Sequence, residues 1–140
     1  MVVPRWLPSL PCLFFAICFL QSGLDKVFDR AGNLEWLVPH FAKTPFKSMV
    51  PIMLRALTAL ELTTGLVCAI GVFQPLLGLY FLRTLSLALA CLTLCALFAG
   101  QRISKDYAGA GTLAIYFAVA LIGLESTSRY AEQWSVLPNH

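Results

Sequence analysis

Apolar residues run in four long stretches along the chain, and shorter polar segments separate them. The stretches cover about residues 7–24, 52–73, 76–99 and 109–126. An α-helix rises about 1.5 Å per residue, so each stretch is long enough for a helix that crosses most of a hydrocarbon layer about 30 Å thick. The pattern predicts an all-α integral membrane protein. We expect one domain over residues 1–140, an antiparallel bundle of four helices.

The composition is that of a membrane protein. Hydrophobic residues make up 59% of the 140 residues and charged residues 12%, whereas soluble domains carry about 25% charged residues. The lipid bilayer is therefore a predicted partner. The net charge of +3 comes without a basic stripe interleaved with aromatic residues, so no nucleic-acid partner is predicted. The five cysteines and two histidines lack metal-ligand spacing, so no metal site is predicted and the cysteines are interpreted as apolar packing residues.

The segment between the first two apolar stretches mixes aromatic and basic residues from Trp36 to Lys47. Such a composition is typical of a segment in the headgroup region of a bilayer. Asn33 is a candidate N-cap for a short helix that begins at Leu34, and Pro39 is expected to interrupt that helix. We predict an amphipathic interfacial loop, and a lid packed on the bundle is the alternative.

One acidic residue, Glu61, lies inside the second stretch. A charge at membrane depth costs at least ~2.5–3.5 kcal/mol, so such a side chain usually faces the protein interior and has a partner. Counted from a tight hairpin at 73–75, Glu61 is about 18 Å deep and Arg83 about 12 Å deep. A pair between them across the hairpin is predicted, although Arg83 could instead extend to the interface. Glu61 is then either a structural ion-pair member or a group that binds a ligand or carries protons.

Further polar residues are predicted to approach Glu61 from the side of the first and third loops. That geometry would form a pocket open at one membrane face and closed near the midplane. Ion pairs of Arg55 with Asp25 or Asp106 are the structural alternative, and Tyr116 at mid-depth should have a hydrogen-bond partner. The sequence assigns no catalytic residue and leaves open whether the protein is an enzyme. The candidate residues for ligand binding or proton transfer are Glu61, Arg83, Arg55, Asp25, Asp106 and Tyr116.

Basic residues gather on one side of the predicted bundle. The terminal side has Arg5 and Arg129, and the other side has six basic residues. Basic residues favour the cytoplasmic side of a membrane, so both termini are expected outside and the pocket mouth in the cytoplasm. The six residues are Lys26, Arg30, Lys43, Lys47, Arg102 and Lys105.

Three short motifs stand at the spans. They are Gly23-Leu24-Asp25-Lys26, Glu61 with Gly65, and Lys105-Asp106-Tyr107-Ala108-Gly109-Ala110 followed by Tyr116-Phe117. Together they resemble the DoxX family of small bacterial four-span membrane proteins, over most of the chain. The resemblance implies a four-helix bundle in the bacterial inner membrane and a link to quinone or to membrane or peripheral oxidoreductase subunits. It implies no catalytic residue, because the family has no agreed catalytic motif.

Three functions fit these features. The first is a redox-associated subunit that binds a quinone or another small apolar ligand near Glu61, and an apolar cavity of ligand size beside Glu61 would favour it. The second is a non-catalytic accessory or assembly protein. A Glu61 that is fully paired and shielded from water, and a segment at 34–46 that can dock a partner, would favour it. The third is a small proton-coupled transporter acting as a homo-oligomer, which requires a wet path past Glu61 to both faces.

Overall fold

The computed structural model describes residues 4, 6–79 and 81–135, with side chains described as far as Arg129, and its regular elements are all helices. Four segments are long and apolar enough to cross a membrane: Leu7–Phe28, Lys47–Val72, Leu82–Ile103 and Tyr107–Arg129. The prediction of an all-α chain with four long apolar helices is confirmed. Arg5, one of the two basic residues assigned to the terminal side, lies outside the described residues.

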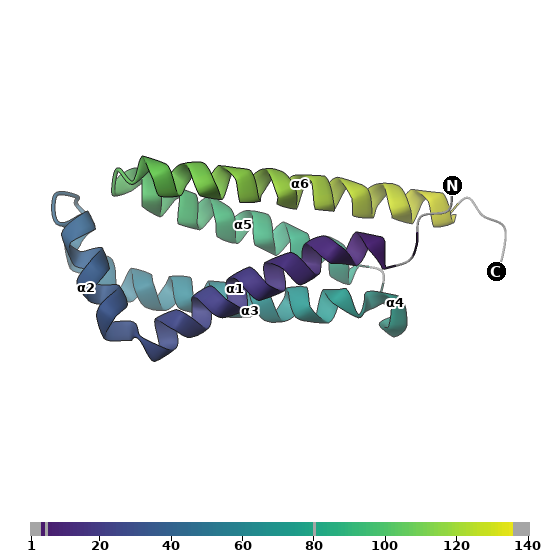
Figure 1. Ribbon diagram of the computed structural model, residues 1–140, viewed down its shortest axis with the longest axis horizontal. Helices are drawn as coiled ribbons and strands as arrows, with labels where there is room; N and C mark the ends of the chain where they lie inside the picture. The colour runs from purple at the N-terminus through teal and green to yellow at the C-terminus, as the bar shows by residue number, and fades with distance from the viewer. Residues whose placement is uncertain (1–3, 5, 80, 136–140) are drawn as a thin grey trace.

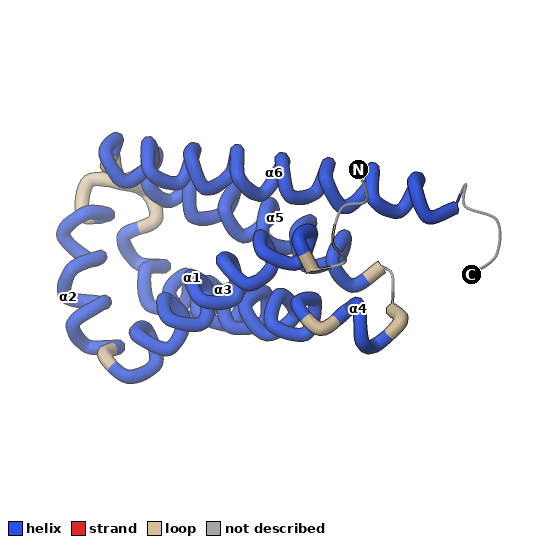
Figure 2. The backbone as a smooth tube through the Cα atoms, turned by 45° about the vertical axis from the view of Figure 1, so that its right-hand side comes forward, coloured by secondary structure: helices blue, strands red, loops and turns tan. Residues whose placement is uncertain are grey.

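The four long helices run in alternating directions, and a shorter helix lies across one end of them (Figure 1). Helix α1 packs against α3, α3 against α5, and α5 against α6. Helix α2 contacts α1 and α3 at the end where α1 finishes and α3 begins, as both views show (Figure 2). In chain order the elements are a 3-10 turn Leu7–Ser9, α1 Leu10–Phe28, α2 Arg30–Phe41, a 3-10 turn Lys47–Met49, α3 Val50–Val72, α4 Gln74–Leu77, α5 Leu82–Ile103 and α6 Tyr107–Ser135.

One buried cluster of side chains joins α1, α3, α5 and α6. The rings of Phe15 and Phe19 stack with centroids 5.7 Å apart, against Cys68 and Leu87 in one buried cluster. Gly65 lets α1 come close, because a Cβ atom there would lie 2.9 Å from the backbone nitrogen of Leu20. The helices are thus joined into one core.

The third long helix begins later than predicted. Residues 74–77 form the single turn α4, which ends at Gly78 with φ 66°, a left-handed conformation that glycine adopts easily. Helix α5 therefore starts at Leu82 rather than at Leu76, and the predicted tight hairpin is a longer connection. As a result, Arg83 lies in the first turn of α5 and not well along a span.

The first long helix continues one turn beyond its predicted end, to Phe28. The predicted membrane span ended at about residue 24, where the apolar stretch ends. This extension places Lys26 inside α1, four residues after Ser22, so that both side chains lie on the same face of the helix.

Helix α2 stands where an irregular amphipathic loop was predicted, and it begins four residues before the predicted start. Asp29 is its N-cap, because its Oδ1 accepts a hydrogen bond of 3.1 Å from the N–H of Gly32. Asn33 lies inside the first turn, where its amide donates to the carbonyl of Asp29 at 2.8 Å. Pro39 lies within the helix, close to its end, and does not break it. The position of this segment in a headgroup region stays a prediction.

We expect Asp29→Ala to weaken α2 without unfolding the long helices. Loss of an N-cap acceptor destabilises a helix by about 1 kcal/mol, which should show as faster amide exchange across α2. The matched control is Glu35→Ala, which removes an exposed carboxylate from the same helix. Equal exchange in the two variants would contradict the capping role.

Candidate functional site

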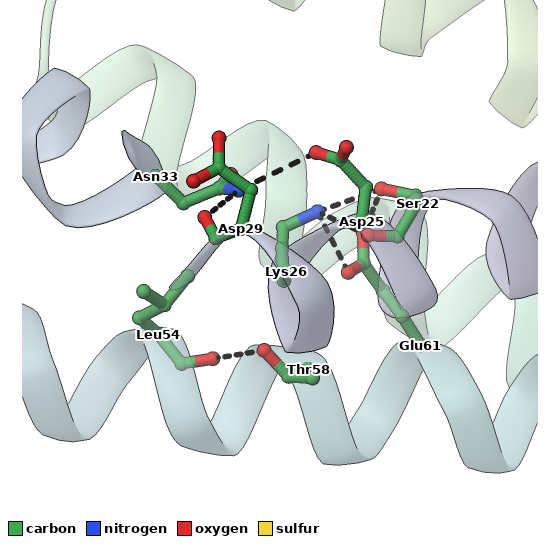
Figure 3. Close-up of polar contacts among 8 residues, drawn as sticks. All are labelled: Ser22, Asp25, Lys26, Asp29, Asn33, Leu54, Thr58 and Glu61. Atoms are coloured by element: carbon green, nitrogen blue, oxygen red, sulfur yellow. Dashed lines mark hydrogen bonds and ion pairs between the residues drawn. The ribbon is translucent and has the colours of Figure 1, made fainter. Parts of the chain in front are cut away.

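The carboxylate of Glu61, on α3, is held by two side chains of α1 (Figure 3). Its Oε2 lies 2.9 Å from Nζ of Lys26, and its Oε1 accepts a hydrogen bond of 2.9 Å from the hydroxyl of Ser22. Lys26 also donates to the hydroxyl oxygen of Ser22 at 2.6 Å, which closes a triangle of three polar groups. The side chain of Glu61 is 1% exposed and that of Lys26 14%, so the pair is largely removed from solvent.

The triangle forms because α1 and α3 approach closely around it. A Cβ atom at Gly23 would lie 2.7 Å from a methyl carbon of Leu62, and one at Gly65 would meet Leu20. Small residues on both helices therefore bring the two backbones together in the turn of α3 that follows Glu61. At this separation the ammonium group of Lys26 reaches the carboxylate directly.

A second polar network ties α2 to the end of α1. The amide of Asn33 donates to Oδ2 of Asp25 at 3.3 Å as well as to the Asp29 carbonyl (Figure 3). Thr58 does not join the Glu61 group, since its hydroxyl donates to the carbonyl of Leu54 at 2.7 Å within α3. The network thus fixes the start of α2 beside the Glu61–Lys26 pair.

A cavity of about 550 Å³ lies beside the ion pair. Five helices form its walls, and this volume is within the range of about 300–1,000 Å³ typical of small-molecule sites. Most lining side chains are apolar, including Leu37 and Phe41 of α2, Leu54 and Leu57 of α3, Leu97 of α5 and Leu113 of α6. Its polar lining comes from Ser22, Lys26, Asn33, Glu61, Gln101 and Ser104.

The polar lining is electrically balanced and retains hydrogen-bonding capacity. Among the described residues, Lys26 and Glu61 are the only charged members of the lining, and their formal charges cancel. Within the described part of the chain, Oε2 of Glu61 makes the ion pair but accepts no hydrogen bond of good geometry, and Oε1 of Gln101 accepts none. Both atoms are buried, whereas the ammonium group of Lys26 belongs to the more exposed member of the pair and can donate to a molecule in the cavity. The site suits an uncharged, mainly apolar molecule with hydrogen-bonding groups.

The predicted partner of Glu61 is corrected by the structure. Lys26 of α1 pairs with Glu61 in place of Arg83. Glu61 is eleven residues before the end of α3, about 16 Å along the axis, whereas Arg83 is the second residue of α5. Because α4 and its turn lengthen the connection, the two side chains are not level. Arg83 is buried, at 1% exposure, near the other end of α3.

The other candidates are placed apart, and among the six predicted residues only Glu61 lines the cavity. Arg55 is exposed, and Asp25 is exposed and bonded to Asn33. Asp106 caps α6, with its Oδ1 accepting from the N–H of Gly109 at 3.0 Å. Tyr116 packs edge-on against Phe14 at 5.6 Å between centroids, and no hydrogen bond of its hydroxyl to another described residue is present. The structure does not bring these residues together around Glu61.

Ser22, Lys26 and Gln101 are not among the six candidate residues chosen from the sequence. A signal for the first two was present, since a serine and a lysine four residues apart share one helical face if the first span is extended to Phe28. Gln101 had no such signal, because its position on the cavity wall depends on how α5 meets the other helices.

Comparison of this chain with protein-family models, with curated protein sequences and with solved structures gave no match.

Proposed function

We propose that this protein is an integral membrane protein, an antiparallel four-helix bundle that binds a small, uncharged, mainly apolar molecule beside Glu61. The observation that carries the proposal is the cavity of about 550 Å³ with a buried ion pair in its wall. An apolar cavity of this size beside Glu61 is what the ligand-binding hypothesis requires. The buried pair adds directional polar groups that can orient a ligand.

Exposed apolar side chains on all four long helices support a membrane location. Ile17 of α1, Leu66 of α3, Leu92 of α5 and Ile122 of α6 are each more than half exposed. In water such a surface would favour aggregation or association, whereas in a bilayer it faces lipid. The basic residues around α2 and the turn before α6 favour the cytoplasm for that end and the outside for both termini. The resemblance to DoxX proteins makes the bacterial inner membrane the proposed location.

A quinone is the ligand that best combines the resemblance with the chemistry of the cavity. A quinone ring is uncharged, and its carbonyl oxygens can accept a hydrogen bond from Lys26, the more exposed member of the ion pair. The apolar wall would hold the ring and its chain. In this proposal the protein is a redox-associated subunit, and the ion pair positions the head group.

Two observations weigh the alternatives. Beyond Glu61, the hydroxyl of Thr64 bonds that of Thr93 at 2.7 Å, and buried apolar residues fill the core. This closed core favours a protein that binds a ligand over a transporter that lets one pass through the bundle. Phe28 and Val38, exposed at the α2 end, favour as second candidate an accessory protein that docks a partner there.

Native mass spectrometry with lipid extraction of the detergent-purified protein tests ligand binding. We expect a small molecule bound to the wild type, and at least about a tenfold loss of occupancy in Glu61→Gln. Lys26 then loses the carboxylate that positions it, and a hydrogen bond to a charged group contributes about 1.5–3 kcal/mol. Leu57→Trp should also empty the protein, because it fills the cavity and leaves both members of the ion pair in the sequence.

The matched controls are Glu125→Gln, which removes an exposed paired carboxylate, and Leu66→Trp, which adds the same bulk on the exposed face of α3. Both should retain the ligand. A wild-type protein that is empty after extraction and takes up no added quinone would remove the ligand-site proposal and leave the accessory role.

A further inference from the structure

We infer that the cavity exchanges its ligand with the hydrocarbon layer through a lateral opening between α3 and α5, bordered by Ala56, Ala96 and Gly100. This inference rests on the proposed function and deepens it, because it restricts the ligand to molecules that dissolve in the bilayer. Three features of the helix contacts support it.

The first feature is where contact between α3 and α5 is closest. Ser86 donates to the carbonyl of Val67 at 3.0 Å, and Thr64 bonds Thr93 at 2.7 Å, so polar contacts join the helices up to this level. The next turns of α5 toward α2 line the cavity instead. The polar contacts therefore hold α3 and α5 together on the side of the cavity away from α2. Nearer to α2, the cavity lies between the two helices.

The second feature is the small size of the side chains at this border. Ala56 on α3 and Ala96 on α5 both line the cavity, and both are exposed. Gly100 also lines the cavity, and a Cβ atom there would meet nothing within 4 Å. Two methyl groups and a glycine cannot close a gap between helices as leucine side chains would, so the wall is thin here.

The third feature is the position of these residues around each helix. The Glu61–Lys26 pair joins α3 to α1, so it stands on the opposite wall from α5. Leu60 and Met53 of α3 and Leu97 of α5 add apolar surface to the cavity lining. A molecule that passes through the opening meets apolar surface first and the polar groups only at the inner wall, which suits an uncharged molecule arriving from lipid. A charged molecule would be excluded by the cost of leaving water.

Trp36, which lines the cavity, provides an optical signal for occupancy. In a protein with Trp6→Phe and Trp134→Phe, Trp36 is the sole tryptophan of the chain. The probe is decylubiquinone, added to phosphatidylcholine vesicles that contain the protein, and the readout is stopped-flow quenching of tryptophan emission.

In this background we expect Ala56→Phe and Ala96→Phe to slow the saturable quenching by about tenfold or more, which lies within the roughly one to three decades over which association rates differ among variants of one binding site. The matched controls are Ala59→Phe and Ala99→Phe, on the same two helices, exposed and outside the cavity lining. They should leave the rate unchanged. If a phenylalanine variant fails to fold, Ala96→Leu tests the same opening with less bulk.

The outcomes separate the opening from the proposed function. Slow quenching in the border variants alone, with the final amplitude retained, supports the lateral opening. Saturable quenching at the same rate in all variants overturns the opening and leaves ligand binding in place, with access beside the exposed Trp36 as the remaining route. Quenching in the wild type that never saturates overturns quinone binding, and the opening with it.

Discussion

Lys26→Met is expected to lower the free energy of unfolding by about 3–5 kcal/mol, because it leaves a buried carboxylate without its cation. Glu61 is 1% exposed and cannot reach water without a rearrangement of α1 or α3. Ser22 would still donate its hydrogen bond, but one neutral donor does not replace an ammonium group at 2.9 Å. The loss should be visible as a shift of unfolding in mixed detergent micelles.

A double-mutant cycle identifies the pair as the cause. Glu61→Gln alone should cost less, since Lys26 is partly exposed and its long side chain can turn outward. Adding Glu61→Gln to Lys26→Met should recover most of the lost stability, because no uncompensated charge then remains buried. Glu125→Gln serves as the control at an exposed pair, where a change within about 0.5 kcal/mol is expected. Equal losses in Lys26→Met and this control would show that the pair contributes nothing.

Gly65→Val is expected to cost about 1–3 kcal/mol by overpacking the contact between α1 and α3. A Cβ atom at Gly65 would lie 2.8 Å from Cγ of Leu20 and 2.9 Å from its backbone nitrogen. The side chain of Leu20 can turn away, but the backbone of α1 can yield only if the whole helix shifts. Such a shift would separate Glu61 from Ser22 and Lys26, so ligand occupancy should fall together with stability.

The matched control is Gly111→Val on α6, where a Cβ atom would meet nothing within 4 Å. Both changes replace a helical glycine with valine, so they share the same effect on helix propensity and differ in packing. Thermal unfolding in detergent and the native mass spectrum are the two measurements. If both variants unfold alike and keep the ligand, then close approach at Gly65 does not determine the site.

The number and approximate extent of the long helices were predictable because they depend on local properties. An apolar stretch of about twenty residues can satisfy its backbone hydrogen bonds within a helix wherever it is placed. Glu61 was also recognisable as a special residue, since a carboxylate in such a stretch is costly unless it is buried with a partner. Asp29 shows the limit of this reasoning, because choosing between it and Asn33 as the cap of α2 depends on the backbone turn at residue 29.

The sequence by itself thus determined that the chain forms four long apolar helices with an acidic residue inside one of them. Only the tertiary structure decided which cation meets that residue and that a cavity opens beside it. The partner of Glu61 depended on the length of α1, which brings Lys26 to it, and on the turn at Gly78, which keeps Arg83 away. The cavity depended on where small residues let α1 approach α3 and where α5 separates from α3. Such distances between helices are set by many side chains acting at once, and no periodicity within one helix contains them.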